Sequence, residues 1–179
     1  NHNLIQQADR FISASPYPVE LITVGRRGRD AMWQLGQKIV AEYSNLPPQP
    51  SVLDVAPIAR TAIQGFISGR FDVVYLAHTV FINTLVQQPE TWQFLPLQQV
   101  QLGNMPLDKH RQAESTLAIG EYIYEPDPAT ILDAVLPRFT ELQIYQAVLE
   151  SLASEHSARM VAKRNATENA NDLLADLLA

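Results

Sequence analysis

The chain has 179 residues, enough for one domain that buries roughly 70% of the surface its unfolded form exposes. Hydrophobic residues make up 46% and charged residues 18%, a composition typical of a globular protein rather than a disordered tail. The net charge of −6 argues against nucleic acid as the main partner, because phosphate binding requires clustered Lys and Arg.

The chain contains no cysteine, which excludes disulfides and thiolate metal ligands. No apolar run approaches the roughly 20 residues of a membrane span, and no signal peptide opens the chain, so we expect a soluble protein. The sequence starts without Met and stops inside the helical pattern "NDLLADLLA". We therefore expect that both ends are cut and that the last helix is severed.

Helices and strands alternate over the first half of the chain. Apolar residues at helical spacing predict a helix over residues 2–13, and "PVELITVG" (18–25) predicts a buried strand. "RRGRDAMWQLGQ" should contain a second helix, and the segment from Ser51 predicts a long one that ends near Gly69. The nearly continuous apolar run 71–81 predicts a strand covered on both faces. The alternation predicts a layered α/β domain with a parallel or mixed sheet.

Residues 86–126 are rich in Gln and Pro, with "QFLPLQQVQL" and "GEYIYEP" as the strand candidates and an exposed loop over 101–114. A helix then begins, with Asp127 as its N-cap and Pro128 at its first position. Helical spacing continues to the C-terminus. Pro137 should bend this helix or mark its true beginning, because proline removes a backbone donor.

No motif in the sequence indicates catalysis. "VGRRGRDA" resembles a phosphate-binding turn, but it matches neither standard glycine-rich pattern, and two glycines often serve only the turn. The four histidines have no partner at metal-ligand spacing, and no Ser stands in a nucleophile elbow. We expect no cofactor and no metal site.

The last helix changes character along its length. Large apolar residues follow one face of its first half and should pack on the α/β domain: Leu142, Ile144, Tyr145, Val148, Leu149 and Leu152. After Leu152 the residues become small: Ala153, Ser154, Ser157, Ala158, Ala162, Ala166 and Ala170. Small side chains let another helix approach to about 8 Å, so this half fits a coiled coil. A solvated helix of high propensity is the alternative.

The stretch "SEHSARMVAKRNATENA" (154–170) resembles the signature of the gamma subunit of F-type ATP synthase, Ser-Glu-x-x-Ala/Ser-Arg-Met-x-Ala-Met-x-x-Ala-Thr-x-Asn-Ala. Other segments agree in order: "LITVGRRG", then "FDVVYLAHTVFINTLVQQP" with a strand and helix of the family, "FLPL", and "YIYEPDPATILDAVLPRF". The chain departs from the family at Lys163, where Met is usual, and at Pro137.

The resemblance implies a fragment of that subunit. Its fold would be a layered, Rossmann-like α/β sheet flanked by helices, over residues 1–126. The long helix over 127–179 would be half of an incomplete coiled coil, with the subunit's own N-terminal helix as the partner outside this sequence. That missing part would also carry the first strand of the sheet, so we expect self-association or a sheet closed by rearrangement.

The resemblance also implies a function without catalysis. The gamma subunit is the central rotor shaft, which couples proton-driven rotation of the membrane c-ring to ATP synthesis in the alpha and beta subunits, and its globular domain binds epsilon. The expected location is the cytoplasmic face of a bacterial plasma membrane, within the complex, in preference to an organelle. Residues expected on the face for coupling or the coiled coil are Glu155, Arg159, Met160, Lys163, Ala166, Thr167 and Asn169.

Two other functions fit the residues alone. One is a nucleotide-binding α/β domain, which would need a ligand at the carboxyl ends of the strands. The other is a free-standing helical dimerisation module.

Overall fold

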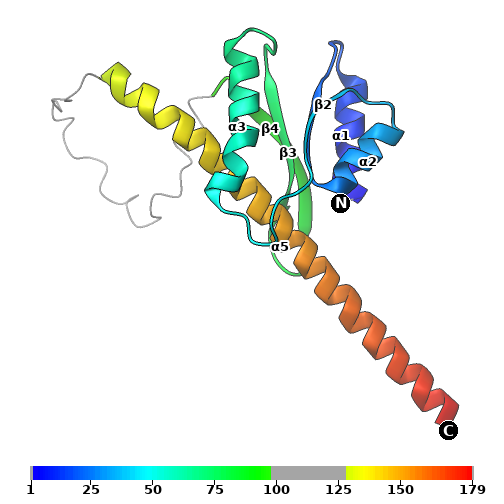
Figure 1. Ribbon diagram of the computed structural model, residues 1–179. Helices are drawn as coiled ribbons and strands as arrows, with labels where there is room; N and C mark the ends of the chain where they lie inside the picture. Colours follow the sequence, from blue (N-terminus) through cyan, green and yellow to red (C-terminus); the bar gives the residue numbers. More distant parts are fainter. Residues whose placement is uncertain (1, 98–127, 179) are drawn as a thin grey trace, which may run out of the picture.

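The computed structural model (Figure 1) describes residues 2–97 and 128–178, without the side chains of 128–134. Residues 2–97 pack with the first half of the last helix into a unit that we call the foot, and the rest of that helix projects from it (Figure 1). The elements follow the chain in this order: α1 (His2–Ala14), β1 (Leu21–Val24), α2 (Arg26–Gln34), β2 (Ile39–Tyr43), α3 (Val52–Ile67), β3 (Val74–Phe81), β4 (Gln87–Leu95) and α5 (Pro128–Leu178). The α/β class, the flanking helices and the long last helix are confirmed.

The predicted elements of the first half are present: α1, β1, α2, α3 and β3. Helix α3 begins where predicted because Oδ2 of Asp54 accepts hydrogen bonds from the backbone N–H and the hydroxyl of Ser51, at 2.8 and 2.6 Å. It ends before Gly69, whose φ of 70° turns the chain toward β3.

The strands form two small sheets rather than one continuous sheet. Strands β1 and β2 are parallel, with Leu21 opposite Ile39, and β3 and β4 are antiparallel, with His78 opposite Glu90. Strand β2 was not predicted. Among the described residues β1 does not pair with β3, so the sheet is not closed by direct pairing of these two strands.

Strand β3 is followed by a tight turn and by β4, which together with β3 form a β-hairpin. The expectation of a helix after β3 was wrong. The turn is set by Asn83, whose Oδ1 accepts hydrogen bonds from the backbone N–H groups of Leu85 and Val86 at 2.9 and 2.8 Å. The chain therefore reverses and pairs Gln87–Leu95 with β3. The strand candidate at 93–102 coincides only with the end of β4. The candidate at 120–126, the loop at 101–114 and the Asp127 cap lie outside the described residues.

Strand β3 has helices on both faces, but its cover is incomplete. Helix α1 lies on one face, where the rings of Phe11 and Tyr75 meet edge to face with centroids 4.8 Å apart. Tyr75 nevertheless stays 48% exposed, so the predicted cover on both faces is present but leaves part of the strand accessible. Helix α5 packs on β3 as well, and α3 packs on α5.

The hydrophobic core lies where α3, β4 and α5 meet. Its buried members are Val55, Ile58, Ala59, Ala62, Phe94, Leu95 and Ile144. Val55 and Phe94 are the largest fully buried side chains of the described residues. The first half of α5 is thus part of the globular foot, and the rest of the helix leaves it.

Helix α5 runs unbroken through Pro137, so the proposal that this proline marks its beginning was wrong. Thr140 donates a hydrogen bond of 2.7 Å to the carbonyl oxygen of Pro137 in this turn. The predicted packing face is confirmed in part: Ile144 is buried and Tyr145 and Val148 pack against the core, whereas Leu142 is 48% and Leu149 40% exposed.

Candidate functional site

The projecting half of α5 carries the residues singled out from the sequence. It extends away from the foot (Figure 1), and from residue 162 to residue 178 every side chain is exposed. Tertiary contacts therefore do not hold this segment helical. Its helix-favouring composition and its intrahelical contacts must do so.

Two ion pairs stabilise the projecting segment from within. Arg159 pairs with Glu155, and Nε of Arg164 lies 2.8 Å from Oε1 of Glu168. Both pairs join residues four apart, with mostly exposed side chains. Such a pair is worth about 0.3–0.5 kcal/mol, too little to determine the fold.

The remaining predicted site residues are all exposed. Met160 is 57% exposed, and Lys163, Ala166, Thr167 and Asn169 are also exposed. The Thr167 hydroxyl donates a hydrogen bond of 3.0 Å to the carbonyl oxygen of Lys163, one turn earlier. The structure therefore places all seven on an accessible helix.

The face of small residues divides in two. Ser154 and Ser157 are buried against the chain's own foot, where the Ser157 hydroxyl donates to the carbonyl oxygen of Thr84 at 3.4 Å. The residues beyond, Ala158, Ala162, Ala166 and Ala170, are exposed. Only this projecting part is available to a second helix.

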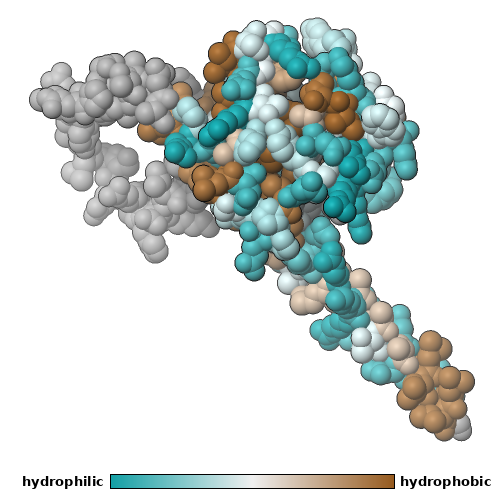
Figure 2. Space-filling view, viewed as in Figure 1, coloured by the Kyte–Doolittle hydropathy of each residue, from teal (hydrophilic) through white to brown (hydrophobic). Residues whose placement is uncertain are grey.

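The end of α5 is strongly apolar, as Figure 2 shows at the tip of the projecting helix. Its four exposed leucines, between 61% and 85% accessible, are Leu173, Leu174, Leu177 and Leu178. Clustered exposed leucines are unusual on the surface of a monomeric soluble protein, so this end has the character of an interface.

Three arginines stand at the start of α2, and one of them, Arg29, is engaged by carboxylates. Gly25 has φ 94°, which serves the turn between β1 and α2. The nearby guanidinium of Arg29 is already held by Asp30 and Glu42, at 2.7 and 3.2 Å, and these hydrogen bonds raise its pKa. A phosphate would have to displace two carboxylates from it.

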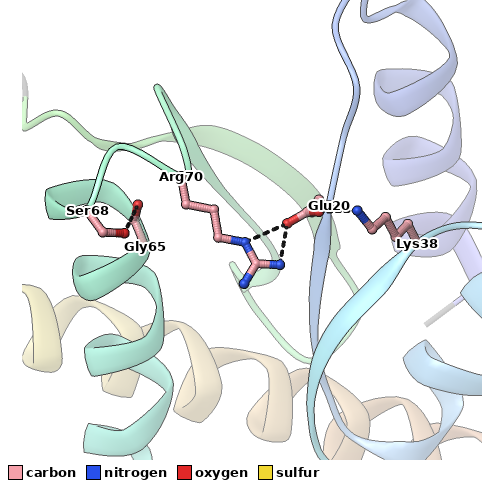
Figure 3. A network of polar contacts seen from close by, with 5 residues as sticks. All are labelled: Glu20, Lys38, Gly65, Ser68 and Arg70. Carbon is pink, nitrogen blue, oxygen red and sulfur yellow. Dashed lines mark hydrogen bonds and ion pairs between the residues drawn. The ribbon is translucent and has the colours of Figure 1, made fainter.

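A second charged cluster lies in the foot (Figure 3). Glu20, just before β1, pairs with Lys38 and accepts hydrogen bonds from Nε and Nη2 of Arg70 at 3.1 and 2.9 Å. The Lys38 ammonium, followed by the Arg70 guanidinium, lowers the pKa of Glu20. Sequence reasoning missed this cluster, although each charge flanks a strand or a helix end.

The described residues contain neither a cluster of metal ligands nor a membrane-spanning helix. Over residues 2–97 and 128–178 no three His, Asp or Glu side chains stand close enough to hold a metal ion. In the same described part of the chain, no helix has the length and hydrophobicity needed to cross a membrane.

Comparison with known proteins gives the family. The sequence model of a family described as ATP synthase matches residues 1–179. The chain is 44% identical over 178 residues to the ATP synthase gamma chain of Roseiflexus castenholzii, and 42% identical over 175 residues to that of Dehalococcoides mccartyi strain CBDB1. The chain belongs to the ATP synthase gamma chain family. Each alignment covers 98% of this chain, which spans 57% of the length of those gamma chains.

Solved structures share the fold. The central stalk of the Tetrahymena thermophila mitochondrial ATP synthase matches with a TM-score of 0.63 at 22% identity, over 91% of this chain and 67% of that one. The rotor of the Euglena gracilis mitochondrial ATP synthase matches with a TM-score of 0.59 at 17% identity, over 94% of this chain and 62% of the other. This chain therefore shares its fold, with the long projecting helix, with these two solved structures.

Proposed function

We propose that this chain is the foot and part of the shaft of a gamma subunit, the central stalk of an F-type ATP synthase. In this role it couples rotation of the c-ring to ATP synthesis or hydrolysis in the alpha and beta subunits. It would do so mechanically, without catalytic residues of its own. The observation that carries the proposal is the 51-residue helix α5, anchored in the foot and exposed beyond it, in a chain of the gamma family.

The two halves of α5 suit a shaft. The N-terminal half of α5 is fixed by buried contacts of Phe139, Ile144 and Ala147 in the foot, so the helix and the foot can turn together. The projecting C-terminal half presents its exposed alanines and leucines to a second helix. The N-terminal helix of the same subunit is the partner we propose, because two packed helices are stiffer than one.

Charge on the projecting segment supports a role at the catalytic head. Glu155, Arg159 and Lys163 stand at intervals of four and form one stripe, half-buried at Glu155 and exposed at Arg159 and Lys163. We assign this stripe to contacts with the alpha and beta subunits during rotation. Met160, Ala166, Thr167 and Asn169 complete the coupling and coiled-coil faces.

The foot would bind epsilon and stand on the c-ring. The complex would then lie at the cytoplasmic face of a bacterial plasma membrane, with this chain peripheral to the bilayer. The bacterial gamma chains at 42–44% identity support this location, as against an organelle.

Reconstitution tests the proposal. A complete gamma subunit that carries this sequence is combined with alpha, beta and epsilon subunits and a c-ring in vesicles. We expect a complex that pumps protons when ATP is added. A complex that forms without this chain, or that includes it without any ATP-driven pumping, would refute the proposal.

A further inference from the structure

Polar groups occupy the place where α5 crosses β3. His78 on β3 is 9% exposed, and its Nε2 lies 3.2 Å from Oε2 of Glu150 on α5. The other carboxylate oxygen, Oε1, accepts a hydrogen bond of 3.0 Å from Gln146, one turn earlier on the helix. Both oxygens of Glu150 are therefore engaged, and one of them reaches across to the sheet.

Two more polar contacts follow along the same crossing. The backbone N–H of Thr79 donates to the Ser151 hydroxyl at 3.4 Å, and the Ser157 hydroxyl donates to the carbonyl oxygen of Thr84 at 3.4 Å. A side chain of α5 thus accepts a hydrogen bond from the backbone of β3, and a backbone carbonyl of the β3–β4 turn accepts one from α5.

These contacts distinguish one position of the helix from all others. Apolar side chains tolerate a helix that slides or rotates, because any neighbouring apolar surface serves them. A buried polar group is satisfied only where its partner stands, so a displaced helix would leave His78 and Glu150 without each other. Polar pairs in an otherwise apolar contact are known to fix the register of packed helices.

We propose that His78 is a positioning residue, which acts through Glu150 to fix the register and rotation of α5 on the sheet. The inference rests on the proposed function: in a rotor, this crossing would hold the shaft at a set angle to the foot. The position needs a hydrogen-bonding side chain that reaches Glu150, and an apolar side chain of similar size would not replace it.

The N–H of Thr79 reports the register, because its partner is a side chain of α5. We would measure the hydrogen exchange of this N–H in the folded chain for His78→Leu and His78→Gln. The matched control is His156→Leu, a change at an exposed histidine of α5. We expect exchange roughly tenfold or more faster in His78→Leu, and wild-type exchange in the control and in His78→Gln. Unchanged exchange in His78→Leu, or equal acceleration in His78→Gln, would overturn the inference.

Glu150→Leu provides a second route if His78→Leu does not fold. It removes the helix partner and should accelerate exchange at Thr79 as well; unchanged exchange would count against the inference. The same variants in the reconstituted complex separate the two proposals. Fewer protons pumped per ATP in His78→Leu than in His156→Leu supports both. Faster exchange in a chain that never joins the complex refutes the proposed function and leaves the positioning role of His78 intact.

Discussion

Arg70 and Glu20 connect the two small sheets through their side chains: Nε and Nη2 of Arg70 lie 3.1 and 2.9 Å from Oε2 of Glu20. Glu20 precedes β1 and Arg70 precedes β3, two strands that do not pair with each other in the described part of the chain. The contact therefore holds the starts of these strands together where no backbone ladder does.

Loss of the Glu20 charge should make the fold less stable at neutral pH. Because Lys38 and Arg70 lower the pKa of Glu20 from its ordinary value of 4.5, the stabilisation is present above that value and is lost as the pH falls below it. Glu20→Gln should melt at a lower temperature than the wild type at pH 7, and the difference should shrink toward pH 3. Thermal melts at several pH values measure this, with Glu168→Gln on the projecting helix as the control. A difference that grows in acid would contradict the assignment.

Gly65 should not tolerate a side chain. A Cβ at this position would overlap the ring of Phe71, which packs against α3. We expect Gly65→Ala to destabilise the fold by about 1–3 kcal/mol, although alanine favours helices. Gly28→Ala in α2 is the matched control, because no heavy atom lies within 4 Å of the added Cβ. Denaturant unfolding compares the two; equal stability of the variants would show that Phe71 moves aside freely.

Arg159 should act in coupling and not in stability. Its pair with Glu155 is half exposed, so Arg159→Ala should leave the melting temperature of the chain within a few degrees. In the reconstituted complex we expect less ATP-driven proton pumping relative to hydrolysis. Arg164→Ala, which removes the similar pair with Glu168 further along the helix, is the control. Unchanged pumping efficiency, or a chain that unfolds, would disprove the coupling role.

The chain on its own should self-associate. Strands β1 and β3 each pair on one side only among the described residues, and a free strand edge recruits other chains. Light scattering should show a mass that rises with concentration. Ala77→Lys places a charge at an exposed position of β3 and should reduce the association, whereas Ala14→Lys, at an exposed position at the end of α1, should not. A strict monomer at every concentration would contradict this prediction.

The sequence predicted the elements that carry a strong local pattern. Helix α3 has a capping residue, helical spacing and a terminal glycine, and β3 is a continuous apolar run. Strand β4 was missed because its start, "QQPETWQ", is polar and contains Pro89, and its place in a sheet depends on pairing with β3. The helix expected after β3 came from the family resemblance, and the turn at Asn83 replaced it with a hairpin.

In the candidate site too, the sequence predicted the residues that a local pattern marks and missed the contacts between distant residues. The position of Glu155 and Arg159 on one stripe of the helix follows from helical spacing alone, so the sequence could predict it. The contact of His78 with Glu150 joins residues 72 positions apart, and neither residue has a local pattern that distinguishes it from a solvated side chain. Such pairs depend on how α5 lies across β3, which only the folded chain determines.

Rotation is the most direct test of the shaft role. Because the chain has no cysteine, Tyr17→Cys gives this part of the gamma subunit a single attachment point, at a position that is 77% exposed in the foot. A fluorescent probe on that cysteine is followed in single reconstituted complexes whose catalytic head is fixed to a surface. We expect the probe to turn in one direction when ATP is added and to stop when hydrolysis is inhibited. A probe that stays still while the same complexes hydrolyse ATP would contradict the account.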